Sequence, residues 1–245
     1  YGIASLLYDL SDNCYHIGYS PLMLVDVVYK QICRYVNENA LQETKELLSD
    51  SNKEHLMLVA DLRIEESCEK LVAQLPVLDG FVCNAGIGKM LPLQFYSLDV
   101  LNEVFQMNCF VPMLLLKLLV KKKKLRNSSS VVFTASISGY NNVAPANGIY
   151  GTSKSALSTY MKYAALELAG KGIRCNAVQP GRINTPLISN RLLSEEDVIK
   201  DIEQYPMKRY GKPEEVAFAI IYLLSDASAW VTGTNLVIDG GRSLK

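Results

Sequence analysis

The sequence predicts an α/β fold, a single domain built on a doubly wound parallel sheet with helices on both faces. Short apolar runs of strand length alternate along the chain with longer segments of helical periodicity. The apolar runs are nearly continuous, which is typical of parallel strands that are buried on both faces. The length of 245 residues is ordinary for one such domain.

The expected elements alternate from the middle of the chain to its carboxyl-terminal end. Ser97 is a candidate N-cap for a long helix, Pro112 predicts a break or kink in that helix, and Gly170 is expected to end the next one. In chain order, the expected elements are strand His55–Ala60, helix Glu65–Gln74, strand Gly80–Cys83, helix Leu98–Lys124, strand Ser130–Phe133, helix Ile149–Ala169, strand Arg174–Gln179 and strand Asn235–Ile238.

The charge of the chain is balanced, with 25 basic and 25 acidic side chains. Such a chain has no global basic field, so we expect no nucleic-acid partner. One basic run, Lys121–Lys124, is short and contains no aromatic residue. We interpret it as a solvated helix end, because cations stabilise the carboxyl end of a helix.

The six cysteines are interpreted as free and mostly buried thiols. None has the C-x-x-C spacing, and the sequence contains only 2 histidines, so we expect no metal site. Buried free thiols are typical of a reducing compartment, and no signal peptide opens the sequence, so we expect a cytoplasmic protein. The longest apolar run, Phe110–Val120, is shorter than the ~20 residues of a membrane span, so we expect no membrane partner.

Several kinds of active site are excluded because their motifs are missing. A Ser-His-Asp hydrolase needs a histidine base beside its serine, but His16 and His55 both fall in expected strands. The sequence contains no G-x-S-x-G elbow, no H-E-x-x-H helix and no Walker A loop.

Tyr150 and Lys154 form a candidate proton-transfer pair. Their spacing places them on one face of a helix, one turn apart. A neighbouring ammonium favours the phenolate and lowers the pKa of a tyrosine from its usual ~10 towards the working range. The pair can therefore donate a proton to a carbonyl oxygen or accept one from an alcohol. The spacing alone is also compatible with an ordinary surface pair.

Polar or glycine-containing turns follow four of the expected strands. These turns begin at Asp61-Leu62, Asn84-Ala85-Gly86, Ser136 and Pro180-Gly181. Each alone can be a simple turn or a helix cap. Because the carboxyl ends of parallel strands meet at one edge of the sheet, where open α/β sheets bind ligands, the joint pattern predicts one shared crevice.

The motifs resemble those of the short-chain dehydrogenase/reductase family, most closely the 3-oxoacyl-carrier-protein reductase type. The resemblance covers about residues 55–245 and implies a Rossmann-like sheet of mostly seven strands. The matching motifs are Asn84-Ala85-Gly86, Asn108 within Met107-Asn108-Cys109, Ser136, Tyr150-x-x-x-Lys154, Asn176–Gly181 with Thr185, and Val231-Thr232-Gly233 through Asp239-Gly240-Gly241.

The resemblance implies a role for each matching residue. The implied catalytic residues are Tyr150 as acid/base, Lys154 as the group that lowers its pKa, Ser136 as the residue that orients the carbonyl, and Asn108 in a proton relay. Ser138 is the alternative to Ser136, which is preferred because it stands three residues before Gly139. The implied cofactor-binding residues are Asp61, Leu62, Asn84, Ala85, Gly86, Tyr150, Lys154, Pro180, Gly181 and Thr185.

The implied activity is that of an oxidoreductase that reduces a carbonyl with a nicotinamide cofactor. The leading substrate is a 3-oxoacyl thioester, small or carrier-bound, as in fatty acid biosynthesis. NADP is favoured over NAD, because the expected second strand ends at Ile17–Ser20 without a carboxylate. Tyr19 nevertheless stands where NADP-using relatives usually carry arginine. The alternative is a nucleotide-sensing or scaffold protein of the same fold that has lost turnover.

Three further expectations concern the whole chain. No glycine-rich turn is present near Tyr1, so we expect residues 1–245 to form one domain that lacks the first strand and this turn. Pro186–Tyr205 is expected to be a mobile substrate lid, with a helix that begins near Ser194. A homotetramer is expected through the apolar segments Val111–Leu116 and Met161–Leu166, with the last helix, Pro213–Ser225, and the last strand.

Overall fold

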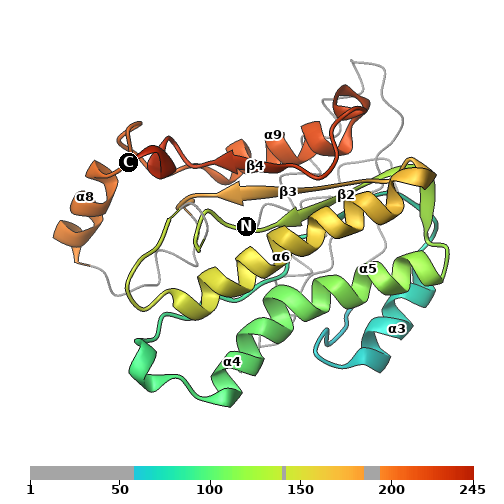
Figure 1. The fold of residues 1–245 in the computed structure, drawn as a ribbon, viewed down its shortest axis with the longest axis horizontal. Coiled ribbons are helices and arrows are strands. Elements are labelled where there is room, and N and C mark those ends of the chain that lie inside the picture. The colour runs from blue at the N-terminus through green and yellow to red at the C-terminus, as the bar shows by residue number, and fades with distance from the viewer. Residues whose placement is uncertain (1–57, 140–141, 185–193) are drawn as a thin grey trace.

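The computed structural model describes residues 58–139, 142–184 and 194–245. These residues contain a four-stranded parallel sheet in the order β1-β2-β3-β4 (Figure 1). The strands are β1 (Leu78–Cys83), β2 (Leu125–Thr134), β3 (Arg174–Pro180) and β4 (Asn235–Ile238). The expected α/β fold with a parallel sheet is therefore confirmed, while the expected second strand, which ends at Ile17–Ser20, lies outside the described residues.

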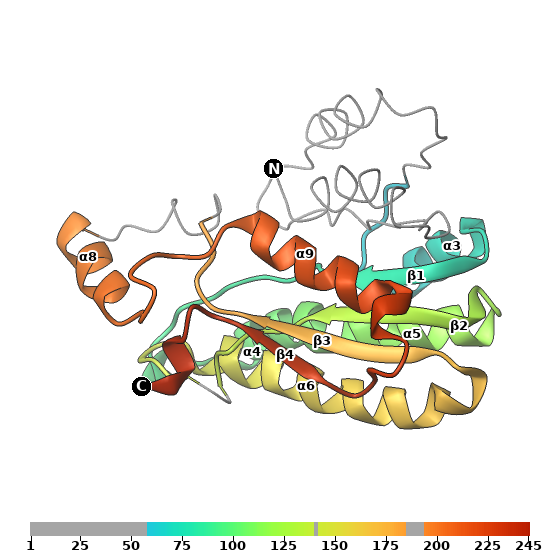
Figure 2. The same cartoon turned by 90° about the horizontal axis from the view of Figure 1, so that it is seen from above.

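Both faces of the sheet are covered by helices (Figure 2). Phe81 pairs with Val131, and both side chains pack into the larger apolar core on the side of the sheet covered by α3 (Glu65–Gln74), α5 (Val111–Lys121) and α6 (Gly148–Leu168). The next pair, Val82 and Val132, faces the opposite side and packs against α9 (Pro213–Leu224). Successive side chains point to opposite faces of a strand, so two buried faces need a continuous apolar run.

The described helices agree closely with the expected ones. They are α3 (Glu65–Gln74), α4 (Leu98–Phe105), α5 (Val111–Lys121), α6 (Gly148–Leu168), α8 (Glu195–Glu203) and α9 (Pro213–Leu224). Short 3₁₀ turns lie at Leu93–Phe95, Ala169–Lys171, Asp226–Ser228 and Arg242–Leu244.

The long helix predicted after Ser97 is interrupted, as expected. Ser97 caps α4, because its side chain accepts a hydrogen bond from the backbone N–H of Val100. Between α4 and α5 the chain forms a π-helical turn, Gln106–Phe110. Pro112 lies in the first turn of α5, where a backbone N–H would have no partner within the helix. The π-helical turn therefore falls just before the proline.

Two boundaries differ from the sequence prediction. Leu58–Ala60, the described part of the strand expected at His55–Ala60, pairs with no described strand, and the Val59 side chain is 58% exposed. An apolar run does not form a strand without a neighbouring ladder. Helix α6 passes through the turn Ala169–Lys171 before it stops, so Gly172, with φ +70°, adopts the left-handed conformation rather than Gly170.

The basic run Lys121–Lys124 stabilises the end of another helix. The ammonium of Lys122 donates to the carbonyl of Glu69, and that of Lys124 donates to the carbonyls of Ala73 and Leu75. These carbonyls belong to the carboxyl-terminal part of α3 and the residue that follows it. The run lies at the carboxyl end of α5, as predicted, and it also places positive charge near the carboxyl end of the α3 dipole.

The segment Leu98–Lys121 is long and apolar enough to cross a membrane by length and composition alone. It is longer than the expected run Phe110–Val120, because α4, the π turn and α5 are continuous. In the fold, α5 packs against α3 and the π turn packs against α6, and Val104, Val111 and Leu118 are fully buried. The segment thus packs as a core helix.

The four described cysteines, Cys68, Cys83, Cys109 and Cys175, are free and buried, as predicted. Burial raises the pKa of each thiol, to about 12 for Cys83 and Cys175. These thiols are therefore neutral and unreactive at physiological pH. Cys14 and Cys33 lie outside the described residues.

Candidate active site

A cavity of about 720 Å³ lies at the carboxyl ends of the strands, the end to which the arrows point in Figure 1. Its walls come from the turns after β1, β2 and β3, the first turns of α6, the end of α8 and the carboxyl-terminal residues. Three of the four turns expected to share a crevice do so. The polar residues that line it are Asn84, Thr134, Ser136, Ser138, Asn142, Asn147, Tyr150, Lys154, Arg182, Asp201, Gln204, Tyr205 and Arg242.

Helix α6 brings Tyr150 and Lys154 to this cavity together. Lys154 is 3% exposed, and its ammonium donates to the carbonyl of Thr134 at the end of β2, across 2.7 Å. Burial lowers the pKa of Lys154 to about 8, and Cys83 and Cys109 raise it more weakly. Lys154 therefore remains mostly protonated at neutral pH. Tyr150 is half-buried and lines the same cavity.

Both candidate serines line the cavity in the turn that follows β2. Ser136 is nearly buried, and its Oγ accepts a hydrogen bond of 3.1 Å from the backbone N–H of Ser138. The Oγ of Ser138 accepts one of 3.1 Å from the side-chain amide of Asn147. The turn thus holds both hydroxyls in place, and the preference for Ser136 as the residue that orients the carbonyl stays a prediction.

Two glycines allow close contact between α6 and the turn after β2 that contains Ser136 and Ser138, which we call the serine turn. Gly139 has a φ of +93°, and a Cβ there would lie 2.5 Å from the carbonyl oxygen of Gly151. A Cβ on Gly151 would in turn lie 3.2 Å from the backbone of Gly139. Glycine at both positions lets the serine turn approach the first turns of the helix that carries Tyr150.

Asn108 positions the wall of the cavity rather than lining it. Its buried side chain accepts from the N–H of Ile87 at 2.8 Å and donates to the carbonyl of Ile87 at 2.9 Å. It also donates to the Oγ of Ser153, one residue before Lys154, at 3.0 Å. The π turn places Asn108 where it joins the turn after β1 to α6, and its role in a proton relay stays a prediction.

The geometry fits the expected nicotinamide nucleotide. A Cβ on Gly86 would lie 3.0 Å from both the Lys154 ammonium and the Oδ1 of Asn108, so the backbone here is close to both groups. The Oγ1 of Thr134, also in the cavity wall, is buried without a hydrogen-bond partner among the described residues. An ammonium has three N–H groups, and one of those of Lys154 binds Thr134, so the others suit ribose hydroxyls.

Not all of the predicted cofactor residues reach the cavity. Asn84, Gly86, Pro180 and Gly181 line it, whereas Ala85 packs against the core. Thr185 lies outside the described residues.

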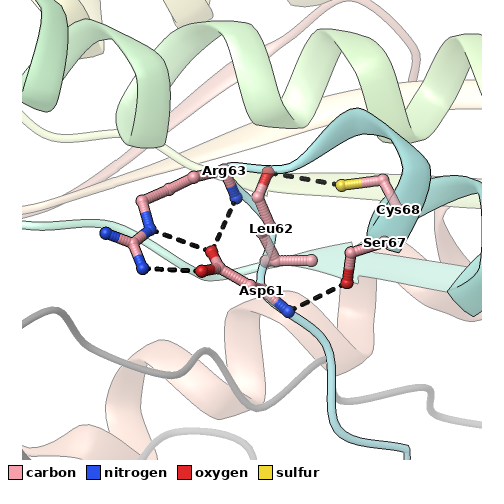
Figure 3. Close-up of polar contacts among 5 residues, drawn as sticks. All are labelled: Asp61, Leu62, Arg63, Ser67 and Cys68. Carbon is pink, nitrogen blue, oxygen red and sulfur yellow. Dashed lines mark hydrogen bonds and ion pairs between the residues drawn. The ribbon is translucent and has the colours of Figure 1, made fainter.

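Asp61 and Leu62 lie just before α3 and form a cluster of polar contacts with Arg63, Ser67 and Cys68 (Figure 3). The carboxylate of Asp61 accepts from the Nε and Nη2 of Arg63 at 2.9 and 2.6 Å, and from its backbone N–H at 3.1 Å. The Leu62 side chain is fully buried, and its carbonyl accepts from the thiol of Cys68. Neither residue lines the cavity at the carboxyl ends of the strands, and their role in cofactor binding stays a prediction.

Sequence reasoning missed the charged residues Arg182, Asp201 and Arg242 in the cavity wall. A signal was available, because Arg182 directly follows the Pro180-Gly181 turn and Arg242 directly follows Gly240-Gly241. Asp201 had no such signal, since α8 reaches the cavity through the fold alone.

Helix α8 is the described part of the predicted lid. Ser194 caps it, because its Oγ accepts from the N–H of Asp197 at 3.1 Å. Its carboxyl-terminal end is tied to the end of β3, since the hydroxyl of Tyr205 accepts from the N–H of Arg182 at 3.1 Å. Residues 185–193 lie outside the described residues, so the mobility of the lid stays a prediction.

Comparison with known proteins identifies the family. The family model described as enoyl-(acyl carrier protein) reductase matches residues 29–243. The chain is 32% identical to levodione reductase of Leifsonia aquatica over 221 residues, which cover 85% of the chain and 82% of that protein. It is 36% identical to the 3-oxoacyl-[acyl-carrier-protein] reductase FabG of Thermotoga maritima over 180 residues, covering 73% and 72%.

The fold comparison agrees with the sequence comparison. The crystal structure of levodione reductase superimposes with a TM-score of 0.82 at 26% identity, covering 99% of this chain and 94% of that one. The chain belongs to the short-chain dehydrogenase/reductase family, and it is an NAD(P)-dependent oxidoreductase that acts on CH–OH or C=O groups.

Proposed function

We propose that this enzyme reduces a ketone to a secondary alcohol, with Tyr150 as the proton donor. The observation that carries the proposal is that Tyr150, Lys154 and Ser136 line one cavity, with the Lys154 ammonium buried beneath it. The three side chains come from two elements that the glycine pair Gly139 and Gly151 holds in contact.

The chain's own residues position and protonate the carbonyl oxygen. Ser136 donates a hydrogen bond to this oxygen, and Tyr150 gives it a proton. The positive charge of Lys154 favours the phenolate that remains on Tyr150, because an opposite charge nearby stabilises the ionised form. A bound reduced nicotinamide supplies the hydride for the carbonyl carbon.

A 3-oxoacyl thioester, small or carrier-bound, is the leading substrate. The support is the 36% identity to a 3-oxoacyl-[acyl-carrier-protein] reductase, while the 32% identity to a levodione reductase supports a small ketone. Fold and family do not select between them, because related sites on this fold take different substrates.

NADP is the proposed cofactor, in preference to NAD. The strand end that supports it, Ile17–Ser20, contains no carboxylate to repel a 2′-phosphate, and it lies outside the described residues. Tyr19 supplies no positive charge, so the preference for NADPH in kcat/KM is expected to be modest. A higher kcat/KM for NADH than for NADPH would contradict the proposal.

Steady-state turnover tests the proposed activity. The purified protein is assayed with NADPH and NADH against a 3-oxoacyl thioester and a simple diketone, following loss of the reduced cofactor. Turnover of either carbonyl compound supports the reductase. Tight binding of the nucleotide without turnover of any carbonyl compound would instead favour the nucleotide-sensing or scaffold protein.

A further inference from the structure

The active-site cavity has a second charged region that the proposed reaction does not use. Arg182 lies directly after Gly181 at the end of β3, and Arg242 begins the 3₁₀ turn Arg242–Leu244. Asp201 of α8 is the one acidic residue among the described residues that line the cavity. The cavity wall therefore carries three cations, counting Lys154, against one carboxylate.

The charge of Arg182 is compensated within the protein. Its Nη1 lies 3.1 Å from the Oδ2 of Asp201 and donates to the hydroxyl of Tyr210 at 3.3 Å. The Tyr210 hydroxyl donates to the same Asp201 oxygen at 2.9 Å. The guanidinium also lies 5.9 Å from the centroid of the Tyr210 ring. Arg182 is thus already paired and serves to tie α8 to β3.

Arg242 is held in place without such compensation. Its Nη2 donates to the neutral amide oxygen of Gln204, and its guanidinium lies 6.0 Å from the centroid of the Tyr205 ring. Within the described part of the chain it forms no ion pair with a carboxylate. A guanidinium has five N–H donors in a planar fork that matches a carboxylate, and the Gln204 contact accounts for one of them.

We propose that Arg242 binds a carboxylate of the substrate, which favours an oxo acid with a free carboxylate over the 3-oxoacyl thioester named above as the leading substrate. This inference rests on the proposed function: the ketone lies at Tyr150 while the acid group lies at Arg242. Met90, Val143 and Pro145 line the same cavity and offer an apolar wall to the carbon chain that joins the two groups. Gln204 and Tyr205 fix the guanidinium beforehand, which reduces the entropy lost on binding.

The proposal is tested with oxo acids of increasing chain length and their methyl esters, which keep the carbon chain, lack the negative charge and are larger by one methyl group. Arg242→Gln removes the charge but keeps an amide donor. We expect the KM of the preferred acid to rise roughly ten- to hundredfold, with kcat little changed, and the KM of its ester to stay the same. The matched control is Arg126→Gln, because Arg126 pairs with Asp79 away from the cavity and should leave both substrates unaffected.

Several outcomes would overturn the carboxylate site. One is an unchanged KM for every acid, and another is an equal loss for acid and ester. A third is a higher KM for NADPH alone, which would assign Arg242 to a cofactor phosphate. A fourth is a loss confined to a coenzyme A thioester, which would assign it to a substrate phosphate.

A binding measurement separates this inference from the proposed function. Calorimetry with the alkanoate of the same length, which lacks the oxo group, measures the carboxylate site without turnover. If no carbonyl compound is reduced, the proposed function fails, and the difference in alkanoate affinity between wild type and Arg242→Gln still decides the role of Arg242. Equal affinities would overturn the inference even if ketones are reduced.

Discussion

The ammonium of Lys154 donates to the carbonyl oxygen of Thr134 across 2.7 Å, and through this bond the first turns of α6 are joined to the end of β2. The bond orients a buried cation that has no carboxylate among its hydrogen-bond or charge partners in the described part of the chain. A charge in such a place lowers the stability of the folded state, and this loss should be measurable apart from activity.

Replacement of Lys154 by methionine should raise the free energy of unfolding at neutral pH. The same replacement should remove turnover. Burial lowers the pKa of Lys154 from 10.5 to about 8, which corresponds to about 3 kcal/mol of destabilisation below pH 8. The lost hydrogen bond to Thr134 offsets about 1–2 kcal/mol of this gain. We therefore expect a net gain of about 1–2 kcal/mol in urea unfolding without cofactor.

The gain in stability of Lys154→Met over the wild type should depend on pH. Between about pH 8 and 10.5 the unfolded chain binds more protons at Lys154 than the folded chain, so the wild type gains stability as pH rises through this window. The advantage of Lys154→Met should shrink over the same window. Lys162→Met, at an exposed lysine of the same helix, is the matched control. A loss of stability at neutral pH in Lys154→Met would contradict the assigned cost of burial.

Tyr150→Phe should remove turnover and leave cofactor affinity within a few fold. The variant lacks only the hydroxyl that we assign to proton transfer, and loss of a general acid typically reduces the rate about 10²–10⁴-fold. Cofactor binding by fluorescence titration and kcat for a ketone are measured on the same preparation. Tyr160→Phe is the matched control on α6, because the Tyr160 ring packs against Phe133 outside the cavity. Retention of most of the wild-type kcat would show that another group donates the proton.

The sequence predicted the elements whose pattern is local. Ser97 was identified as an N-cap and Glu65–Gln74 as a helix, because both depend on nearby residues in the chain. The strand expected at His55–Ala60 depends on a neighbouring ladder that the sequence cannot display. Its described part, Leu58–Ala60, is therefore not a strand.

The same distinction holds for the site. Tyr150 and Lys154 share one helix, and their spacing together with the neighbouring motifs predicts them as a pair. Asp201 and Arg242 reach the cavity only because α8 and the carboxyl-terminal turn fold over it. The pairing of Asp61 with Arg63 adds to the sequence prediction without testing it, because a carboxylate that binds its neighbour can still accept a further hydrogen bond from a ligand.

Gly139→Ala should destabilise the protein and impair the serine turn. An alanine at φ +93° is strained, and its Cβ would lie 2.5 Å from the carbonyl oxygen of Gly151. We expect a loss of about 2–4 kcal/mol in the free energy of unfolding, with a lower kcat in the folded fraction because Ser136 shifts. Chemical denaturation and steady-state kinetics measure the two effects.

Gly170→Ala is the matched control for this glycine. A Cβ at Gly170 meets nothing within 4 Å, so alanine should be neutral or stabilise slightly by restricting the unfolded chain. If both variants unfolded at the same denaturant concentration as the wild type, the close contact between Gly139 and Gly151 would not exist in solution.

The oligomeric state can be tested at one helix face. The expected homotetramer uses Val111–Leu116 and Met161–Leu166 together with the last helix and the last strand. Val111, Leu115 and Leu116 are buried within the protomer, so the first of these segments offers little apolar surface. On α6, by contrast, Tyr163 is 63% exposed and Leu166 is 79% exposed. The prediction therefore keeps two interfaces, this face of α6 and the last helix with the last strand, where Phe218 and Val237 are also exposed.

Leu166→Lys should therefore split the assembly. A two-fold interface contains each side chain twice, so the loss of two buried leucines at about 2 kcal/mol each should raise the dissociation constant roughly a thousandfold. Light scattering at micromolar concentration should then change from a tetramer mass to a smaller one. Leu93→Lys is the control, because Leu93 is equally exposed, at 79%, but lies outside α6. A monomer mass for the wild type would contradict the homotetramer, and a tetramer mass for Leu166→Lys would exclude the α6 face from the interface.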